Sequence, residues 1–242
     1  MTAYLRITTK MVSAHMGIEM DWRAAVQEGV YPVAFAAKMT EMTNARVASW
    51  FRARSQSTLA PAIITPYEPV KGQLVMPFLA LVESRFVARF RKHGLSLQTI
   101  RKVAKKLRQK HDLLHPFATQ SRFRTDGRRI MMEIADDEER HLLDIMTDEW
   151  AFPSVVEPSL FDSVVYVDDI AVRMHPFTEF PHVIIDPRYA LGRPIIEEGF
   201  IPTRTLASAY LAEGDLDAVA DWFNTTPDLV SQAVGFEQRI AA

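Results

Sequence analysis

The chain has 242 residues, of which 48% are hydrophobic and 24% are charged, and it contains no cysteine. This composition is typical of a folded globular protein, and it excludes disulfides and thiolate metal sites. No apolar run is long enough to cross a membrane, and residues 1–10 lack the apolar centre of a signal peptide. We therefore expect a cytoplasmic protein with no membrane partner.

Charge is divided unevenly along the chain. Residues 1–132 carry 22 Lys and Arg against 8 Asp and Glu, a formal charge of +14 (22 − 8). Residues 133–242 carry 6 against 22, a formal charge of −16 (6 − 22). The basic part predicts contact with nucleic acid. The acidic part would be repelled by phosphate, so we expect it to contact protein or a second copy of itself.

Residues 1–29 give no clear pattern and are treated as an N-terminal extension. From Val33 to Met39 the apolar residues are spaced for one short helix. Thr43 then offers an N-cap for a second helix, whose apolar positions include Val47 and Trp50. Two short helices joined by a tight turn are the minimum of a helix-turn-helix.

Residues 55–77 contain five prolines and glycines, and the apolar segments Ile63-Ile64 and Leu74-Val75-Met76 flank the turn-rich middle of this stretch. Two apolar segments around a turn-rich centre predict a hairpin, which would be the wing of a winged helix.

Two longer helices are predicted next. Apolar residues at helical spacing run from Phe78 to Phe90, and Gly94 ends that pattern before a second one begins behind a Ser96 cap. Between Arg85 and Lys110 there are ten Lys and Arg residues and no acid. This basic run predicts either phosphate contacts or an ordinary solvated helix face.

From residue 113 onward, we expect a β-containing middle followed by a helical tail. Thr125-Asp126-Gly127 and Asp168-Asp169 each predict a hairpin turn, with an acidic helix at 136–147 between them. Residues 183–187 and 192–196 are expected to be short strands. Three short amphipathic helices follow, the second capped by Asp215.

These elements predict a mainly α fold with small β-hairpins. The expected divisions are the extension (1–29), a winged helix-turn-helix head (30–112), a β-hairpin and acidic-helix middle (113–181), and a trihelical, helix-turn-helix-like tail (182–242). We expect a homodimer, because one recognition helix reads too few base pairs for useful specificity.

The DNA contacts are expected on the second short helix, the wing and the basic helix. Base edges would be met by the start of the second short helix and phosphates by the other cations. The alternative is a helical pair that only packs the core. The expected DNA-binding residues are Thr43, Asn44, Arg46, Arg52, Arg54, Lys71, Arg101, Lys105 and Arg108.

Catalysis, cofactors and metals are not expected. The chain has no glycine-rich nucleotide loop, no Ser-His-Asp arrangement and no cysteine nucleophile. His111 and His115 have a metal-ligand spacing, but no third ligand is evident. A metal-dependent hydrolase built on the acids of residues 136–139 is the alternative, and a solvated helix N-terminus explains those acids as well.

Residues 31–107 resemble the N-terminal part of MerR-type regulators. The resemblance is carried by residues 31–37 (YPVAFAA), residues 46–50 (RVASW), and the run from residues 78–83 (FLALVE) to residues 94–101 (GLSLQTIR). It implies a MerR-like winged helix-turn-helix that binds double-stranded DNA. A MerR regulator continues into a long coiled-coil helix, whereas here His115-Pro116-Phe117 follow, so dimer contacts must come from elsewhere.

Residues 183–242 are similar to a small domain of VapB-type antitoxins. The similarity rests on residues 183–187 (VIIDP), 192–196 (GRPII), 201–203 (IPT) and 219–223 (VADWF). A MerR-like head before this domain resembles the VapB antitoxins that partner PIN-like ribonuclease toxins. The resemblance implies an antitoxin that binds its toxin directly and represses its own operon; a MerR-like transcription regulator without a toxin is the alternative. The toxin-contact residues are not indicated.

Overall fold

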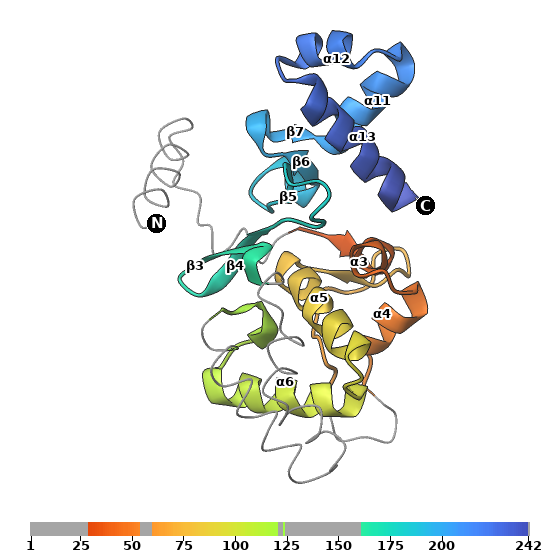
Figure 1. The fold of residues 1–242 in the computed structure, drawn as a ribbon. Helices are drawn as coiled ribbons and strands as arrows, with labels where there is room; N and C mark the ends of the chain where they lie inside the picture. The colour runs from red at the N-terminus through yellow and green to blue at the C-terminus, as the bar shows by residue number, and fades with distance from the viewer. Residues whose placement is uncertain (1–28, 54–59, 121–122, 124–160, 242) are drawn as a thin grey trace.

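The computed structural model describes residues 29–53, 60–120, 123 and 161–241, and it arranges them as two lobes, seen one above the other in Figure 1. The N-terminal lobe (described residues 29–123) contains helices α3 to α6. The C-terminal lobe (161–241) contains helices α11 to α13 and a five-stranded antiparallel sheet. Strands β3 and β4 of that sheet lie beside α5 of the N-terminal lobe, as Figure 1 shows.

The two predicted short helices are present as α3 (Val33–Thr40) and α4 (Asn44–Trp50). Helix α3 ends at Glu41, whose left-handed φ of 55° turns the chain sharply. The Thr43 hydroxyl accepts a hydrogen bond from the Arg46 amide at 3.3 Å, so the predicted N-cap is confirmed. Helix α3 also packs against α5, which fixes the pair on the lobe.

The sheet pairing around the predicted wing differs from expectation. Strand β2 (Val75–Met76) pairs with β1 (Tyr31–Pro32), and not with Ile63-Ile64, so the predicted pairing of the two wing segments is wrong. The reason is that Ile63 is fully buried and donates its amide to the Trp50 carbonyl at 3.1 Å, which ties it to the end of α4. A tight turn remains at Lys71-Gly72, both with positive φ.

The two predicted long helices are α5 (Phe78–Lys92) and α6 (Leu97–His111). Gly94 has a φ of 88°, which suits a residue without a Cβ at the turn between them. The predicted Ser96 cap is confirmed, since its hydroxyl accepts from the Thr99 amide at 3.0 Å. A short 3-10 helix, η1 (Pro116–Ala118), follows and packs against α5 and α6.

The five-stranded sheet is larger than the small hairpins expected from the sequence. Its order is β3-β4-β5-β6-β7, antiparallel throughout. The hairpin predicted around Asp168-Asp169 is confirmed, and both aspartates have the positive φ of such a turn. The strands are β3 (Val164–Val167), β4 (Ile170–Met174), β5 (Val183–Ile185), β6 (Pro194–Ile196) and β7 (Ile201–Pro202), with 3-10 turns η3 (Ala190–Gly192) and η4 (Glu198–Phe200) on either side of β6.

The three predicted tail helices are present as α11 (Thr203–Glu213), α12 (Leu216–Phe223) and α13 (Pro227–Ala241). The predicted cap on α12 is confirmed, because Asp215 Oδ1 accepts from the amides of Asp217 and Ala218 at 2.9 and 3.3 Å. The three helices enclose a core whose fully buried members are Leu206, Val219, Val230, Ala233 and Phe236.

Several sequence predictions fall outside the described residues. They are the hairpin around Thr125-Asp126-Gly127, the acidic helix at 136–147 and the predicted DNA-binding residue Arg54. Among the helices that are described, no helix has the length and apolar character needed to cross a bilayer.

Candidate functional site

The exposed start of α4 is the first part of the candidate site. Val47 and Trp50 point into the core, so the opposite side of this short helix is left to solvent. Thr43, Asn44 and Arg46 are all exposed on it. The Arg46 guanidinium lies near the Met42 sulfur, with Nη1 at 3.6 Å, and keeps its solvent exposure. This arrangement presents two small polar side chains and one cation together.

Three further predicted cations are exposed around α4. Arg52 lies two residues after the end of α4, Lys71 lies in the tight turn before β2, and Lys105 lies on α6. Lys71 has a φ of 50°, because it is the first residue of the two-residue turn that Val70 and Gln73 close with two hydrogen bonds of 2.9 Å. Exposed cations of this kind are suited to phosphate contacts.

Arg101 and Arg108, which were also predicted to bind DNA, are used inside the lobe. Arg101 is 8% exposed and donates to the Ser49 and Arg52 carbonyls, at 3.3 and 2.9 Å. Arg108 donates to the Pro61 and Ala62 carbonyls at 3.0 and 2.7 Å, and burial lowers the pKa of its guanidinium. Both side chains therefore fix the end of α4 and the chain that follows it, and we leave them out of the proposed interface.

Much of the predicted basic run also has partners within the protein. Arg85 donates to the His175 carbonyl at 2.9 Å, Arg91 donates to the Leu95 carbonyl, and Lys92 pairs with Glu41 at 3.0 Å. The charge separation between the lobes nevertheless holds. The described N-terminal lobe has 14 Lys and Arg against 4 Asp and Glu, a net +10, and the described C-terminal lobe has 5 against 13, a net −8.

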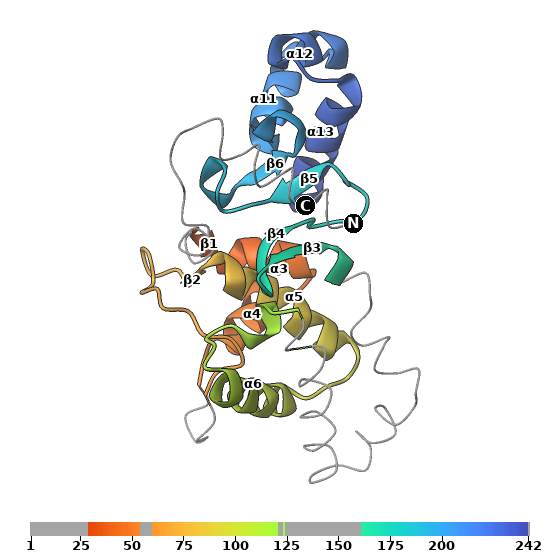
Figure 2. The ribbon, with the colours of Figure 1, turned by 90° about the vertical axis from the view of Figure 1, so that its left-hand side faces the viewer.

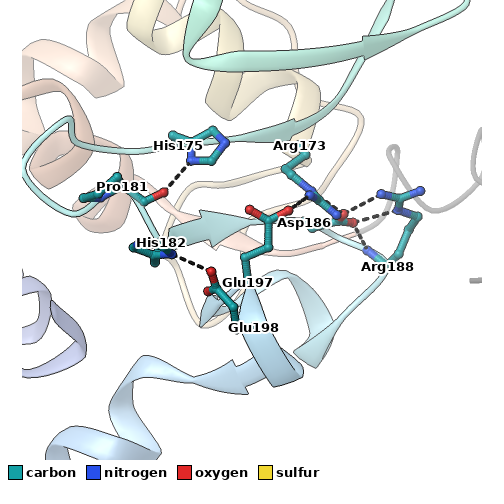
Figure 3. A network of polar contacts seen from close by, with 8 residues as sticks. All are labelled: Arg173, His175, Pro181, His182, Asp186, Arg188, Glu197 and Glu198. Carbon is teal, nitrogen blue, oxygen red and sulfur yellow. Dashed lines mark hydrogen bonds and ion pairs between the residues drawn. The ribbon is translucent and has the colours of Figure 1, made fainter. Parts of the chain in front are cut away.

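Asp186 organises the turn after β5, as the close view in Figure 3 shows. Its carboxylate is fully buried and accepts from the Arg188 amide and from Arg188 Nε and Nη2, at 3.0, 2.9 and 2.6 Å. Arg173 Nε on β4 adds a fourth bond at 3.2 Å, and Arg173 also pairs with Glu197. The hydrogen bond to Asp186 raises the pKa of Arg188. This network explains the acid in the VIIDP motif: it joins β4 to the end of β5.

Tyr31 and Gly192 connect the two lobes. The Tyr31 hydroxyl donates a buried hydrogen bond of 2.9 Å to the Gly192 carbonyl, across 161 positions of sequence. A Cβ on Gly192 would lie 2.1 Å from that hydroxyl oxygen, so only glycine fits. Each residue belongs to a motif that resembles a different family, and no local sequence pattern predicts that the two motifs touch.

A second bridge between the lobes runs through Glu41. This carboxylate pairs with Lys92 at 3.0 Å and with Arg239 of α13 at 2.7 Å. The hydrogen bond from Lys92 lowers the pKa of Glu41. The Arg239 guanidinium lies 4.4 Å from the Phe177 ring centre. These groups line a cleft of about 320 Å³ between α5 and residues 176–179.

In the ranges that the structure describes, no three His, Asp or Glu side chains form a possible metal site. His115 is instead buried against Glu83, with Nδ1 2.9 Å from the carboxylate, while the other Glu83 oxygen accepts from the Phe117 amide at 3.0 Å. His115 and Glu83 thereby hold η1 on α5.

The fold and the exposed residues define a two-lobed protein with a basic lobe that carries a short exposed helix and an acidic lobe of three helices on a sheet. No protein-family model matches the chain. Over 223 residues it is 24% identical to a Mycobacterium tuberculosis protein named "Putative antitoxin VapB45", with 85% of this chain and 92% of that protein covered. It is also similar to the crystal structure of Rv2018 from Mycobacterium tuberculosis, with a TM-score of 0.67 and 24% identity over 84% of this chain and 96% of that one.

Proposed function

We propose that this chain is a VapB-type antitoxin that binds and silences a PIN-like ribonuclease toxin and represses its own operon by binding operator DNA. The observation that carries the proposal is the similarity to a protein named as an antitoxin, which extends over 85% of this chain and so includes both lobes. The division of charge between the lobes supports it, because a basic surface suits DNA and an acidic one suits a basic protein.

In this proposal α3 and α4 form a MerR-like helix-turn-helix. Helix α4 enters the major groove, where Thr43, Asn44 and Arg46 at its start meet base edges. Arg52, Lys71 and Lys105 contact phosphates, and each contact adds about one counterion to the salt dependence of binding. Two copies bind two half-sites as a homodimer, since one α4 of seven residues reads few base pairs. No enzymatic step and no cofactor are part of the proposal.

The test is co-expression of this chain with the product of the neighbouring gene, followed by purification on a tag carried by one partner. We expect a stoichiometric complex with a small PIN-like protein that inhibits growth when it is expressed alone. A gel-shift assay on the upstream DNA of the operon should show binding by the chain itself. A toxic neighbour that neither binds this chain nor is silenced by it would contradict the antitoxin role.

A MerR-like transcription regulator without a toxin is the second candidate. The exposed polar start of α4 and the cations around it favour DNA binding in either case. The regulator would shift its upstream DNA and yield no partner protein. The two candidates therefore both bind DNA through the basic lobe. They differ in whether the acidic lobe binds a toxin.

A further inference from the structure

Two large apolar side chains, Leu211 near the end of α11 and Trp222 in α12, are left exposed by the fold. Leu211 is 86% exposed and Trp222 is 62% exposed, whereas Trp50 is 1% exposed. The inward side of α12 is already supplied by Val219 and Ala220. An indole held in water by a well-packed helix is unusual, and aromatic anchors of this kind are enriched at protein interfaces.

Acidic side chains surround these two apolar residues in sequence. No Lys or Arg occurs between Arg204 and Arg239, a stretch that holds six acids. Four of them fall at or beside α12, and all four are exposed. We call this region the α11–α12 tip; it consists of Leu211, Glu213, Asp215, Asp217, Asp221 and Trp222.

We infer that the α11–α12 tip is the toxin-binding surface and that it docks on the RNA-binding face of the ribonuclease. The inference rests on the proposed function. A ribonuclease must hold a phosphodiester chain, so its substrate face carries Lys and Arg, and bases stack on its aromatic or apolar side chains. Carboxylates around an exposed indole offer that face both of the features that RNA offers: negative charge and a flat ring.

The position of the tip is compatible with simultaneous DNA binding. Figure 1 and Figure 2 both place α12 at the end of the molecule opposite α6, with β5 and β6 between α12 and the N-terminal lobe. A toxin held at α12 therefore leaves α4 and the turn at Lys71 accessible. The other exposed apolar residues of this lobe are less suited: Phe200, for example, stacks on Tyr189 with ring centres 4.2 Å apart.

The test measures binding of the full chain to the separately purified product of the neighbouring gene. We expect Trp222→Ala to weaken binding by at least about 30-fold, as at an interface hot spot. Leu211→Ala should weaken it several-fold, while the matched control Leu191→Ala, at a residue that is 84% exposed but lies away from the tip, should not. Asp221→Lys should weaken binding and reduce its salt dependence. The control is Asp162→Lys, at an exposed acid just before β3, and it should do neither.

Three further readouts decide the outcome. All variants should keep the wild-type melting temperature and the wild-type affinity for DNA, which shows that they are folded. A 2′-O-methyl RNA oligonucleotide, which the nuclease cannot cleave, should compete with the wild-type chain for the toxin. A toxin that binds this RNA and the chain together would overturn docking on the RNA face.

The failure of the inference differs from the failure of the proposed function. If the wild-type chain binds no toxin, the antitoxin role fails and the surface assignment fails with it. If the wild type binds and Trp222→Ala and Asp221→Lys bind equally well, the antitoxin role stands and the α11–α12 tip is wrong.

Discussion

The hydroxyl of Tyr31 donates a hydrogen bond of 2.9 Å to the carbonyl of Gly192, and this contact fixes the first strand of the basic lobe to the turn before β6 in the acidic lobe. Burial, above all, raises the pKa of the Tyr31 hydroxyl, so that it remains a donor at any working pH. The two lobes are therefore joined by a neutral bond that salt does not screen, alongside the exposed ion pairs of Glu41.

Gly192→Ala should destabilise the protein more than an ordinary glycine substitution. At a φ of 76° an alanine costs about 1–2 kcal/mol of backbone strain, and its Cβ would also lie 2.1 Å from the Tyr31 hydroxyl. The matched control is Gly214→Ala, which has a φ of 77° and open space around the Cβ. Urea unfolding of the two variants separates strain from steric overlap.

Tyr31→Phe provides the complementary test of the same contact. Removal of the hydroxyl leaves the buried Gly192 carbonyl without its donor, which costs about 1–3 kcal/mol. It also removes the atom nearest to the new Cβ, so Gly192→Ala should cost less in the Tyr31→Phe background than in the wild type. Strictly additive losses in the double variant would show that the two residues do not interact in solution.

Arg46→Ala should weaken operator binding by about 1–3 kcal/mol and relax its sequence specificity. Arg46 is exposed beside Asn44, at the start of the proposed recognition helix. The measurement is the dissociation constant for operator and for random DNA at the same salt concentration. Arg204→Ala on the acidic lobe is the control and should bind as the wild type does. Equal losses on both DNAs would mean that Arg46 contacts phosphate only.

Asp186→Asn should be among the most destabilising single changes in the acidic lobe. The substitution leaves the partly buried Arg188 without its carboxylate and Arg173 with Glu197 alone, and the loss of one member of a buried pair costs about 3–5 kcal/mol. Glu198→Gln is the control, because the pair of Glu198 with His182 is exposed and such pairs contribute less than about 1 kcal/mol. Urea midpoints that shift equally would contradict the role assigned to Asp186.

Local sequence patterns predicted the elements well and their pairing less well. The caps at Thr43, Ser96 and Asp215 and the turn at Asp168-Asp169 follow from side chains within a few residues, and all are present. The partner of β2 and the joining of five strands into one sheet depend on contacts across the chain. The link from β4 to β5, for example, has Met174 opposite Ile185 as its one paired position, which no periodicity reveals.

The candidate site shows the same division. Exposure of Thr43, Asn44 and Arg46 could be predicted because Val47 and Trp50 set the inward side of the helix. The use of Arg101 and Arg108 inside the lobe could not be predicted, because their backbone carbonyl partners lie in other segments of the chain. These partners are Ser49, Arg52, Pro61, Ala62 and Leu114. A cation on a helix face has the same sequence signature whether it meets phosphate or a backbone carbonyl.

Stability should fall as the solution is acidified below about pH 6.5, in part because of His175. Burial is the main cause that lowers the pKa of this imidazole, helped by Arg173 and Arg85 and opposed by Glu197. The unfolded chain, with a histidine pKa near 6.5, then binds a proton that the folded chain does not. The contribution is complete above pH 6.5 and is lost as the pH falls toward the lowered pKa.

His175→Gln should reduce this pH dependence, because it removes the imidazole whose Nδ1 donates to the Pro181 carbonyl at 3.1 Å. The measurement is the urea midpoint at pH 7.5 and pH 5.5 for wild type and variant. Part of the slope should remain, since burial also lowers the pKa of His93. Gly214→Ala, which lowers stability without removing a titrating group, should keep the wild-type slope. An unchanged slope in His175→Gln would show that His175 does not contribute to the loss of stability in acid.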